Sequence, residues 1–401
     1  MKRLLIIAST IVAFGWCCYA LAGHALADAL GQRHATALLR LGEGKIISPA
    51  TFVHARLLET LVLVTLLLVW VLGHFLIRWL LTRRLVAPRR AWLVHSVVAF
   101  LALNLWLAQA QRTALFWGLM WQGQQTQNLA RFHLKLILAR EQSATPSVAL
   151  MGSSQMRAQV DEAQLTSRLA PRLRAHDFHY PGARAYDLLL LQPMVSQTRP
   201  ALVVCYLSEL NFYSGSATEV APNFFTAQAL PDLIRRGGLK FIPRERWGCG
   251  LLGQMLPVFQ LREVLAQRLF GPALTELKPE IHAPVLMTNL AAPYAINAES
   301  QFHQGALEDF VTRAGQLGQS VVLVAGQFNP KFARQLDPKI REDMMKFLHA
   351  LAARHPHVTL LENLPPQTEA DYEDMTHLTK DAQARFTAWL AAQLEQHRAA
   401  R

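Results

Sequence analysis

Acidic residues are almost absent from the first third of this 401-residue chain. Residues 1–140 contain 3 Asp and Glu against 15 Lys and Arg, whereas residues 141–401 contain 25 of each kind. The formal net charge of +12 therefore belongs entirely to the N-terminal third (15 − 3 = 12). This distribution argues against a basic globular domain that binds nucleic acid, because the larger part of the chain is neutral.

Charged residues of both signs are scarce as well, at 17% of the chain. Soluble domains usually contain about 25%. Because 52% of the residues are hydrophobic, the chain is too apolar to be disordered. The low charge indicates that part of it lies in lipid.

Cysteine is rare too, with four in the whole chain. None of them forms a CxxC pair or a Cys/His cluster with zinc spacing, so the cysteines give no support to a structural metal site. Cys17 and Cys18 lie inside an apolar run. Cys205 and Cys249 are either a disulfide formed in an oxidising compartment or buried free thiols.

Long apolar runs occur at residues 4–22, 61–77 and 91–108. Each is long enough to cross the hydrocarbon core of a bilayer as a helix, and residues 1–112 are therefore predicted to form a membrane domain with three transmembrane helices. The alternative for the first run is a cleaved signal peptide, in which Lys2 and Arg3 precede the apolar stretch and Ala25-Leu26-Ala27 forms the cleavage site.

The arginines between the second and third runs set the expected orientation. Five of them lie between Arg78 and Arg90, and Lys2 and Arg3 precede the first run. Positive loops stay in the cytoplasm, so the N-terminus is predicted inside and the chain beyond about residue 112 outside the cytoplasmic membrane, in the periplasm of a Gram-negative cell. Residues 113–145 are predicted to be an amphipathic stalk helix and linker, on which Trp117 and Trp121 either anchor at the interface or pack inside.

Short apolar, β-branched runs alternate with helical patterns from residue 146 onward. The runs are Val148–Met151, Ala201–Leu207, Ser320–Ala325 and Val358–Leu361, and the helical stretches are 183–197, 305–317, 338–354 and 380–397. This alternation predicts an α/β domain at 146–401, with a parallel sheet covered on both faces. Residues 213–300 form a helix-rich insertion, which is either a lid or partner-docking surface or a structural subdomain.

Polar groups follow the predicted strands at the edge where parallel sheets carry their functional residues. Ser154 comes after the first strand, in Met151-Gly152-Ser153-Ser154-Gln155. A further strand is expected before the loop that contains Gly182, and Asn211 follows the strand that ends at Leu207. Taken alone, Gly-Ser-Ser is more typical of a helix N-cap than of a nucleophile.

Asp374 and His377 lie in a turn just before the last predicted helix. An Asp and a His three positions apart in a turn can stack, so that the carboxylate holds the imidazole while its other nitrogen faces a serine.

These four places together resemble the SGNH (GDSL-type) hydrolase family over residues 146–397. The likeness is closest to its membrane-anchored branch, the DltD-like acyl-transfer proteins. It implies a flavodoxin-like three-layer fold, Ser154 as nucleophile, His377 as general base and Asp374 as the residue that orients it. The backbone N–H groups of Ser154 and Gly182, together with Asn211, would form the oxyanion hole.

The resemblance also implies an activity and partners. The expected protein is a serine esterase or O-acyltransferase without a cofactor that acts on an acylated cell-envelope glycan or lipid, beside a multi-span O-acyltransferase or a glycan synthase. The sequence departs from the family pattern at Ser153, which replaces an acidic residue, and around Asn211, where the glycine and the second acidic residue are missing.

Two other functions stay open at this point. The departures favour a catalytically silent SGNH-type fold that serves as a scaffold in an acyltransferase or polysaccharide-export complex. A transporter or sensor would rely on the few polar residues within the predicted spans, His74, His95 and Asn104.

Overall fold

The computed structural model describes scattered residues between 75 and 117, and then residues 123–142, 144–213, 224, 230–242, 248, 250–253, 256–261 and 294–399. The predicted span at 4–22 and most of those at 61–77 and 91–108 lie outside these residues, as do Trp121 and Cys249. None of the helices within the described part is long and apolar enough to span a bilayer.

The chain divides into two compact units. The first comprises residues 1–138 and 256–272, and the second comprises residues 139–255 and 273–401. In the first unit, the ring of Trp117 is fully buried and stacks on His133 with 3.9 Å between ring centroids. Its indole Nε1 donates to the carbonyl of Gln111 at 2.6 Å. Trp117 is therefore a packing residue in this structure.

Helix α5 (Gly123–Glu141) coincides with most of the predicted stalk helix. Most of its described side chains are buried, including the polar His133 and Lys135. The helix α13 (Pro257–Gln260) also belongs to the first unit, and its Val258 N–H donates to the Asn104 side chain at 3.0 Å.

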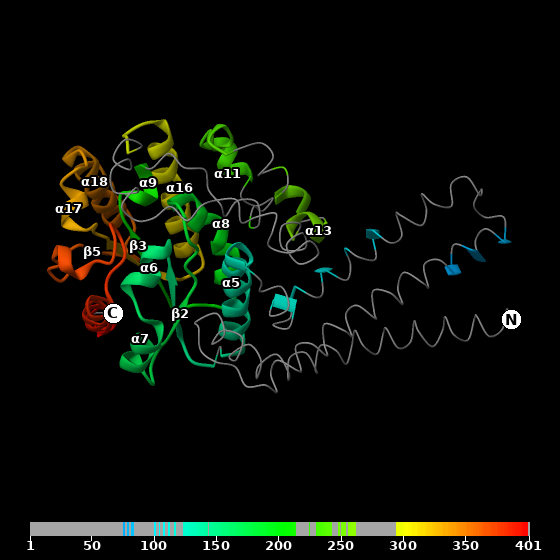
Figure 1. Ribbon diagram of the computed structural model, residues 1–401, viewed down its shortest axis with the longest axis horizontal. Coiled ribbons are helices and arrows are strands. Elements are labelled where there is room, and N and C mark those ends of the chain that lie inside the picture. The colour runs from blue at the N-terminus through cyan, green and yellow to red at the C-terminus, as the bar shows by residue number, and fades with distance from the viewer. Residues whose placement is uncertain are drawn as a thin grey trace. The chain divides into compact units, whose positions relative to one another are not determined.

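The second unit is an α/β domain in which helices surround a central sheet (Figure 1). The sheet has five parallel strands in the order β2-β1-β3-β4-β5. The strands are β1 (Ser147–Met151), β2 (Arg174–Asp177), β3 (Leu202–Leu207), β4 (Ser320–Ala325) and β5 (Val358–Leu361). The apolar runs predicted four of these to within one residue. Strand β2 lacks such a run, yet Ala175, His176 and Asp177 are buried.

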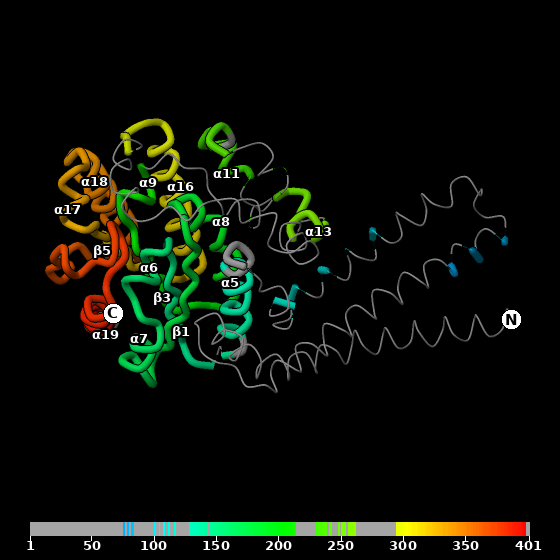
Figure 2. The backbone as a smooth tube through the Cα atoms, in the orientation of Figure 1, coloured from blue at the N-terminus to red at the C-terminus, as the bar shows by residue number. Residues whose placement is uncertain are grey.

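Helices cover both faces of the sheet. On one face, α6 (Ser154–Gln159), α7 (Glu162–Leu169) and the C-terminal helix α19 (Lys380–Ala399) pack on alternate strand residues, including Val204, Tyr206 and Val322. The chain trace shows α19 returning beside α7 (Figure 2). On the other face lie α8 (Ala185–Ser196), α16 (Ala298–Gln316) and α18 (Pro338–Arg354).

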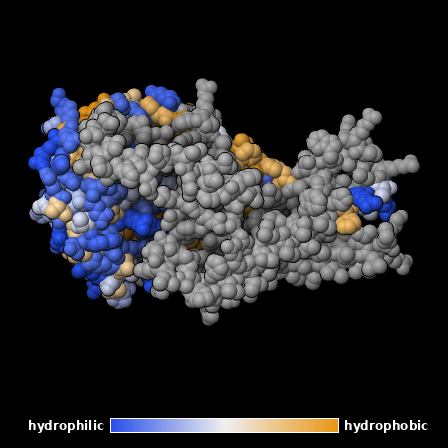
Figure 3. Space-filling model, in the orientation of Figure 1, coloured by the Kyte–Doolittle hydropathy of each residue, from blue (hydrophilic) through white to orange (hydrophobic). Residues whose placement is uncertain are grey.

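Capping residues set where these helices begin. Helix α16 starts seven residues before the predicted 305, because the Asn297 side chain accepts hydrogen bonds from the N–H groups of Glu299 and Ser300 at 2.9 and 3.0 Å. Helix α18 begins as predicted, where Asp337 caps and Pro338 occupies the first position. On the side drawn in Figure 3, the described surface of the α/β domain is mainly hydrophilic.

The strand register brings the carboxyl ends of neighbouring strands to one edge of the sheet. Met151 at the end of β1 pairs with Cys205 near the end of β3, whose last residue, Leu207, pairs with Ala325 of β4. The loops after β1, β2 and β3 therefore emerge side by side, at the point where the strand order reverses.

Cys205 is a free and fully buried thiol whose pKa is raised by desolvation.

Phe386 anchors α19 to the sheet, and its ring lies 6.0 Å from that of Tyr206. The side chain is 1% exposed. We expect Phe386→Ala to lower the free energy of unfolding by about 3–5 kcal/mol, because it removes buried apolar surface and leaves a cavity. Chemical denaturation monitored by circular dichroism measures the change. Glu395→Ala, at an exposed position of the same helix, is the control and should shift stability by less than about 0.5 kcal/mol.

Candidate active site

Ser154 lies at a tight strand-to-helix turn. Gly152 follows β1, and a Cβ built there would lie 3.0 Å from Met156 Cβ and 3.2 Å from the Tyr206 carbonyl oxygen, so the close approach of the chain requires glycine. Ser153 is fully buried and caps α6, its hydroxyl accepting from the Gln155 N–H at 3.3 Å. Ser154 begins the helix and is half-buried. The N-cap is thus Ser153, which leaves the Ser154 hydroxyl free of that task.

Asp374 and His377 share a closed turn before α19. An antiparallel bridge between Tyr372 and Leu378 closes it, and the Glu373 N–H donates to the His377 carbonyl at 2.8 Å. Within the turn, Asp374 Oδ1 accepts from the backbone N–H groups of Thr376 at 2.7 Å and His377 at 2.8 Å. One carboxylate oxygen therefore shapes the turn and the other is left for the imidazole.

The three side chains form a continuous hydrogen-bonded chain. His377 Nδ1 lies 2.6 Å from Asp374 Oδ2, and His377 Nε2 lies 3.0 Å from Ser154 Oγ. An ionised carboxylate only accepts hydrogen bonds, so Nδ1 carries a proton, and Nε2 faces the Ser154 hydroxyl, from which the Nδ1–H tautomer of the ring accepts. The structure brings together Ser154, His377 and Asp374, which are 223 and 3 residues apart in the chain.

Asp374 is stabilised as a carboxylate. Partial burial by itself raises its pKa, but the hydrogen bonds from His377 and Thr376 outweigh the burial and hold the pKa at about 2. The group is therefore ionised throughout the neutral range, as a partner that orients the histidine must be.

Two buried side chains from outside hold the Asp374–His377 turn in place. Gln159 of α6 is fully buried and donates from Nε2 to the Thr376 carbonyl at 2.9 Å. Asn329, the N-cap of α17 (Pro330–Ala333), donates its backbone N–H to the Met375 carbonyl at 2.9 Å and its Nδ2 to the Asp374 carbonyl at 3.2 Å. The helix that carries Ser154 is thus tied to the turn that carries His377.

A second buried chain joins the loops after β1, β2 and β3. The Ser208 hydroxyl donates to Gln155 Oε1 at 2.7 Å, and the Ser208 N–H donates to Asn211 Oδ1 at 2.8 Å. Asn211 Nδ2 in turn donates to the Ala183 carbonyl, beside Gly182, at 2.9 Å. Gln155, Ser208 and Asn211 are all fully buried. These bonds set the distance of the Gly182 loop from Ser154.

The predicted oxyanion donors occupy different surroundings. Gly182 is exposed and has φ +72°, a left-handed conformation that favours glycine. Among the described residues, neither its N–H nor that of Ser154 has a hydrogen-bond acceptor, so both are available to a bound oxygen. Asn211, by contrast, uses its amide to join two loops. That Asn211 donates a hydrogen bond to the oxyanion stays a prediction.

Sequence reasoning missed the residues that support the site. Arg184 donates to the Leu210 carbonyl across the two loops. Arg341 of α18 lies 3.3 Å from Glu209, whose pKa is raised by burial, and donates to the Gly326 carbonyl at 2.6 Å. No local motif marks these residues, because their partners are distant in the chain.

Within the described part of the chain, no three His, Cys, Asp or Glu side chains come together as a metal ion would require.

No family model matches this chain, and no curated protein matches its sequence. Solved structures with some likeness include TesA, at 17% identity and a TM-score of 0.33, over 61% of this chain and 97% of that one. LAE5, an α/β hydrolase enzyme from the metagenome of Lake Arreo, Spain, is 15% identical with a TM-score of 0.31, over 62% and 94%. A protein from Bacteroides fragilis described as an acylhydrolase is 12% identical with a TM-score of 0.32, over 64% and 94%.

The bond between Ser208 and Gln155 can be tested by a double-mutant cycle. Ser208→Ala leaves the Gln155 amide buried without a strong partner and should lower the free energy of unfolding by about 1–3 kcal/mol. Combining it with Gln155→Leu should cost less than the sum of the two single changes, since both polar groups are then gone. Denaturant titration gives the three values. Additive effects would show that the bond carries no coupling energy.

The lowered pKa of Asp374 predicts an acid-side loss of stability. A carboxylate whose pKa is lower in the folded than in the unfolded protein stabilises the fold at pH values above the unfolded-state pKa. This stabilisation is lost as the pH falls from the unfolded-state pKa to the folded-state pKa. The melting-temperature difference between the wild type and Asp374→Asn should therefore shrink between about pH 5 and about pH 2. Glu373→Gln, an exposed neighbour, is the control, and its difference should stay nearly constant.

Proposed function

We propose that this protein is an SGNH-type serine enzyme that transfers or hydrolyses acyl groups through an acyl-serine intermediate. The observation that supports it is the chain of 3.0 and 2.6 Å contacts from Ser154 through His377 to Asp374. Ser154 comes from the loop after β1, and Asp374 and His377 come from the turn before α19, which Gln159 and Asn329 hold in place.

The proposed reaction begins at Ser154. His377 Nε2 takes the hydroxyl proton as Oγ attacks the carbonyl carbon of an ester or thioester, and Asp374 stabilises the imidazolium that forms. The carbonyl oxygen becomes an oxyanion, which the N–H groups of Ser154 and Gly182 stabilise. When the tetrahedral intermediate collapses, the leaving group departs with the proton from His377, and the acyl group stays on Ser154.

The second half-reaction decides between hydrolysis and transfer. His377 removes a proton from the acceptor, which is water or a hydroxyl group, and the acceptor oxygen attacks the acyl carbon. Ser154 leaves and regains its proton from His377. Both outcomes use the same residues, so the acceptor alone separates an esterase from an O-acyltransferase.

Membrane attachment and an envelope substrate are part of the proposal. The apolar runs at 4–22, 61–77 and 91–108 and the arginines from Arg78 to Arg90 support an anchor that places the catalytic domain outside the cytoplasmic membrane. An enzyme tethered there meets glycans and lipids of the envelope. A multi-span O-acyltransferase or a glycan synthase would be the partner that supplies or receives the acyl group.

A catalytically silent scaffold is the second candidate. The observation that favours it is Asn211, whose amide joins the Gly182 and Ser208 loops and is fully buried. A site that lacks this third donor would lose roughly 3 kcal/mol of oxyanion stabilisation.

A fluorophosphonate probe separates the two candidates. It should label the wild-type serine covalently, and Ser154→Ala should abolish labelling because the nucleophile is gone. His377→Ala should slow labelling by about a thousandfold or more. Labelling is read by gel fluorescence and located by mass spectrometry of the modified peptide.

The adjacent serine is the matched control. Ser153→Ala removes a hydroxyl from the same turn and should keep labelling, at a cost in stability of about 1 kcal/mol from the lost N-cap. If the folded wild type is not labelled, or if Ser154→Ala is labelled as well as the wild type, the proposed mechanism is wrong.

A further inference from the structure

A cavity of about 410 Å³ lies where the 213–300 insertion meets the first turns of α16. The described insertion residues there form α11 (Leu230–Arg235) and a 3-10 turn, Gly238–Lys240. The lining is cationic and aromatic: Arg235, Arg236, Lys240, Phe241, Ala298, Gln301 and Phe302. None of these residues belongs to the hydrogen-bonded set of Ser154, His377 and Asp374, so the cavity is separate from the candidate active site.

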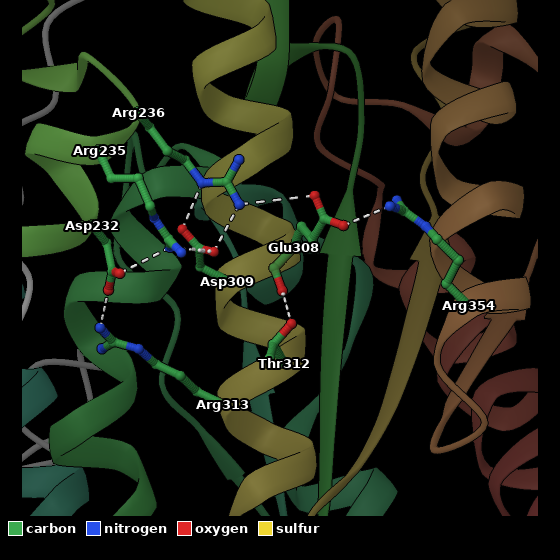
Figure 4. Close-up of polar contacts among 8 residues, drawn as sticks. All are labelled: Asp232, Arg235, Arg236, Glu308, Asp309, Thr312, Arg313 and Arg354. Carbon is green, nitrogen blue, oxygen red and sulfur yellow. Dashed lines mark hydrogen bonds and ion pairs between the residues drawn. The ribbon is translucent and has the colours of Figure 1, made fainter.

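Asp309 of α16 contacts both arginines (Figure 4). One carboxylate oxygen accepts from Arg235 at 2.9 Å and from Arg236 Nη2 at 2.7 Å, and the other accepts from Arg236 Nε at 2.6 Å. A guanidinium has five N–H donors, so each arginine keeps donors beyond those that Asp309 engages. Held guanidinium groups bind phosphate or carboxylate oxygens with little loss of side-chain entropy.

Two glycines make room for this arrangement. A Cβ on Gly305, inside α16, would lie 2.3 Å from Arg236 Nη1, and a Cβ on Gly238 would lie 2.2 Å from the Phe302 ring. Glycine inside a helix costs about 0.5–1 kcal/mol relative to alanine. Gly305 therefore lowers the stability of α16 at the position where the Arg236 guanidinium packs against the helix.

Among the described residues around the cavity, cations outnumber carboxylates. Arg313 pairs with Asp232, and Arg354 pairs with Glu308 at 2.6 Å. The described residues around the cavity include five cations and four carboxylates: Arg235, Arg236, Lys240, Arg313 and Arg354 against Asp232, Glu299, Glu308 and Asp309. Lys240 has no carboxylate partner among the described residues, and its ammonium lies 4.7 Å from the Phe241 ring centre. An anion in the cavity would supply the missing charge.

The aromatic wall adds an apolar surface beside the cations. The rings of Phe241 and Phe302 lie 5.5 Å apart, and Phe302 in turn lies 5.4 Å from Tyr186 of α8, the helix that opens after the Gly182 loop. A ligand with a charged end and a ring or chain attached to it would match both parts of the lining.

We propose that this cavity binds the phosphate group of an anionic ligand, with Arg235, Arg236 and Lys240 facing the phosphate and Phe241 and Phe302 facing the body attached to it. Free phosphate compounds and the headgroups of anionic lipids share this chemistry. The inference is independent of the proposed catalysis at Ser154, because it concerns binding alone.

Phosphorus NMR titration of the full chain in a neutral detergent tests the proposal, with inorganic phosphate and a short-chain soluble phosphatidylglycerol as separate probes. We expect saturable broadening of the probe signal that weakens as salt is added. Lys240→Ala should weaken binding by about three- to fivefold, as expected for one exposed charge. Lys240→Glu should weaken it further. Neither variant removes an ion pair between described residues, so both should keep the wild-type melting temperature.

Matched controls separate this result from catalysis and from surface charge in general. Lys346→Ala removes an exposed lysine from α18 and should bind both probes as the wild type does, as should Ser154→Ala. If the Lys240 substitutions weaken binding of both probes, or of phosphate alone, the site exists and its ligand carries a phosphate group. Binding of phosphatidylglycerol alone supports it with a lipid headgroup as the source. No saturable binding, or equal binding by Lys240→Glu and Lys346→Ala, would overturn it.

Discussion

The parallel pairing of β1 with β2 and β3 is the constraint on which the candidate site depends. Because Met151 pairs with Cys205 and Leu150 with Asp177, the chain leaves all three strands at nearly the same level. Loops from residues 152, 178 and 208 onward must then share one edge of the sheet. A register slip of one residue would turn the alternating side chains to the wrong faces, so the packed core of both faces enforces the alignment.

Buried polar bonds carry that alignment from the strands to the side chains of the site. Ser208 joins the first loop to the third, and Asn211 joins the third to the second. Gln159 and Asn329 hold the Asp374–His377 turn. In a medium of low dielectric constant a broken bond is costly, so these bonds keep the loops rigid, although Gln155 Nε2 and Gln159 Oε1 are buried without a partner among the described residues. The same rigidity explains how a serine and a histidine 223 residues apart can lie 3.0 Å from each other.

Charge is distributed unevenly at two scales. Over the whole chain, the excess of +12 lies before residue 141 and the remainder is neutral. Within that neutral remainder, the residues around α11 and α16 still contain more cations than carboxylates. A net charge of zero therefore says little about local binding, because electrostatic interactions between exposed charges fade over about 10 Å.

Local sequence determined the strands with apolar runs, most helix limits and the Asp374–His377 turn, since hydrophobic periodicity and Asx turns act between near neighbours. It also placed Ser154, Gly182 and Asn211 after successive strands. Only the tertiary structure decided that Ser153 is the N-cap and that β2 forms without an apolar run. It also decided that the Asn211 amide makes hydrogen bonds to two loops. Gln155, Gln159, Arg184 and the Asp309 cluster had no sequence signal. Their partners lie far along the chain, and a hydrogen bond or ion pair depends on distance in space, which only the folded sheet supplies.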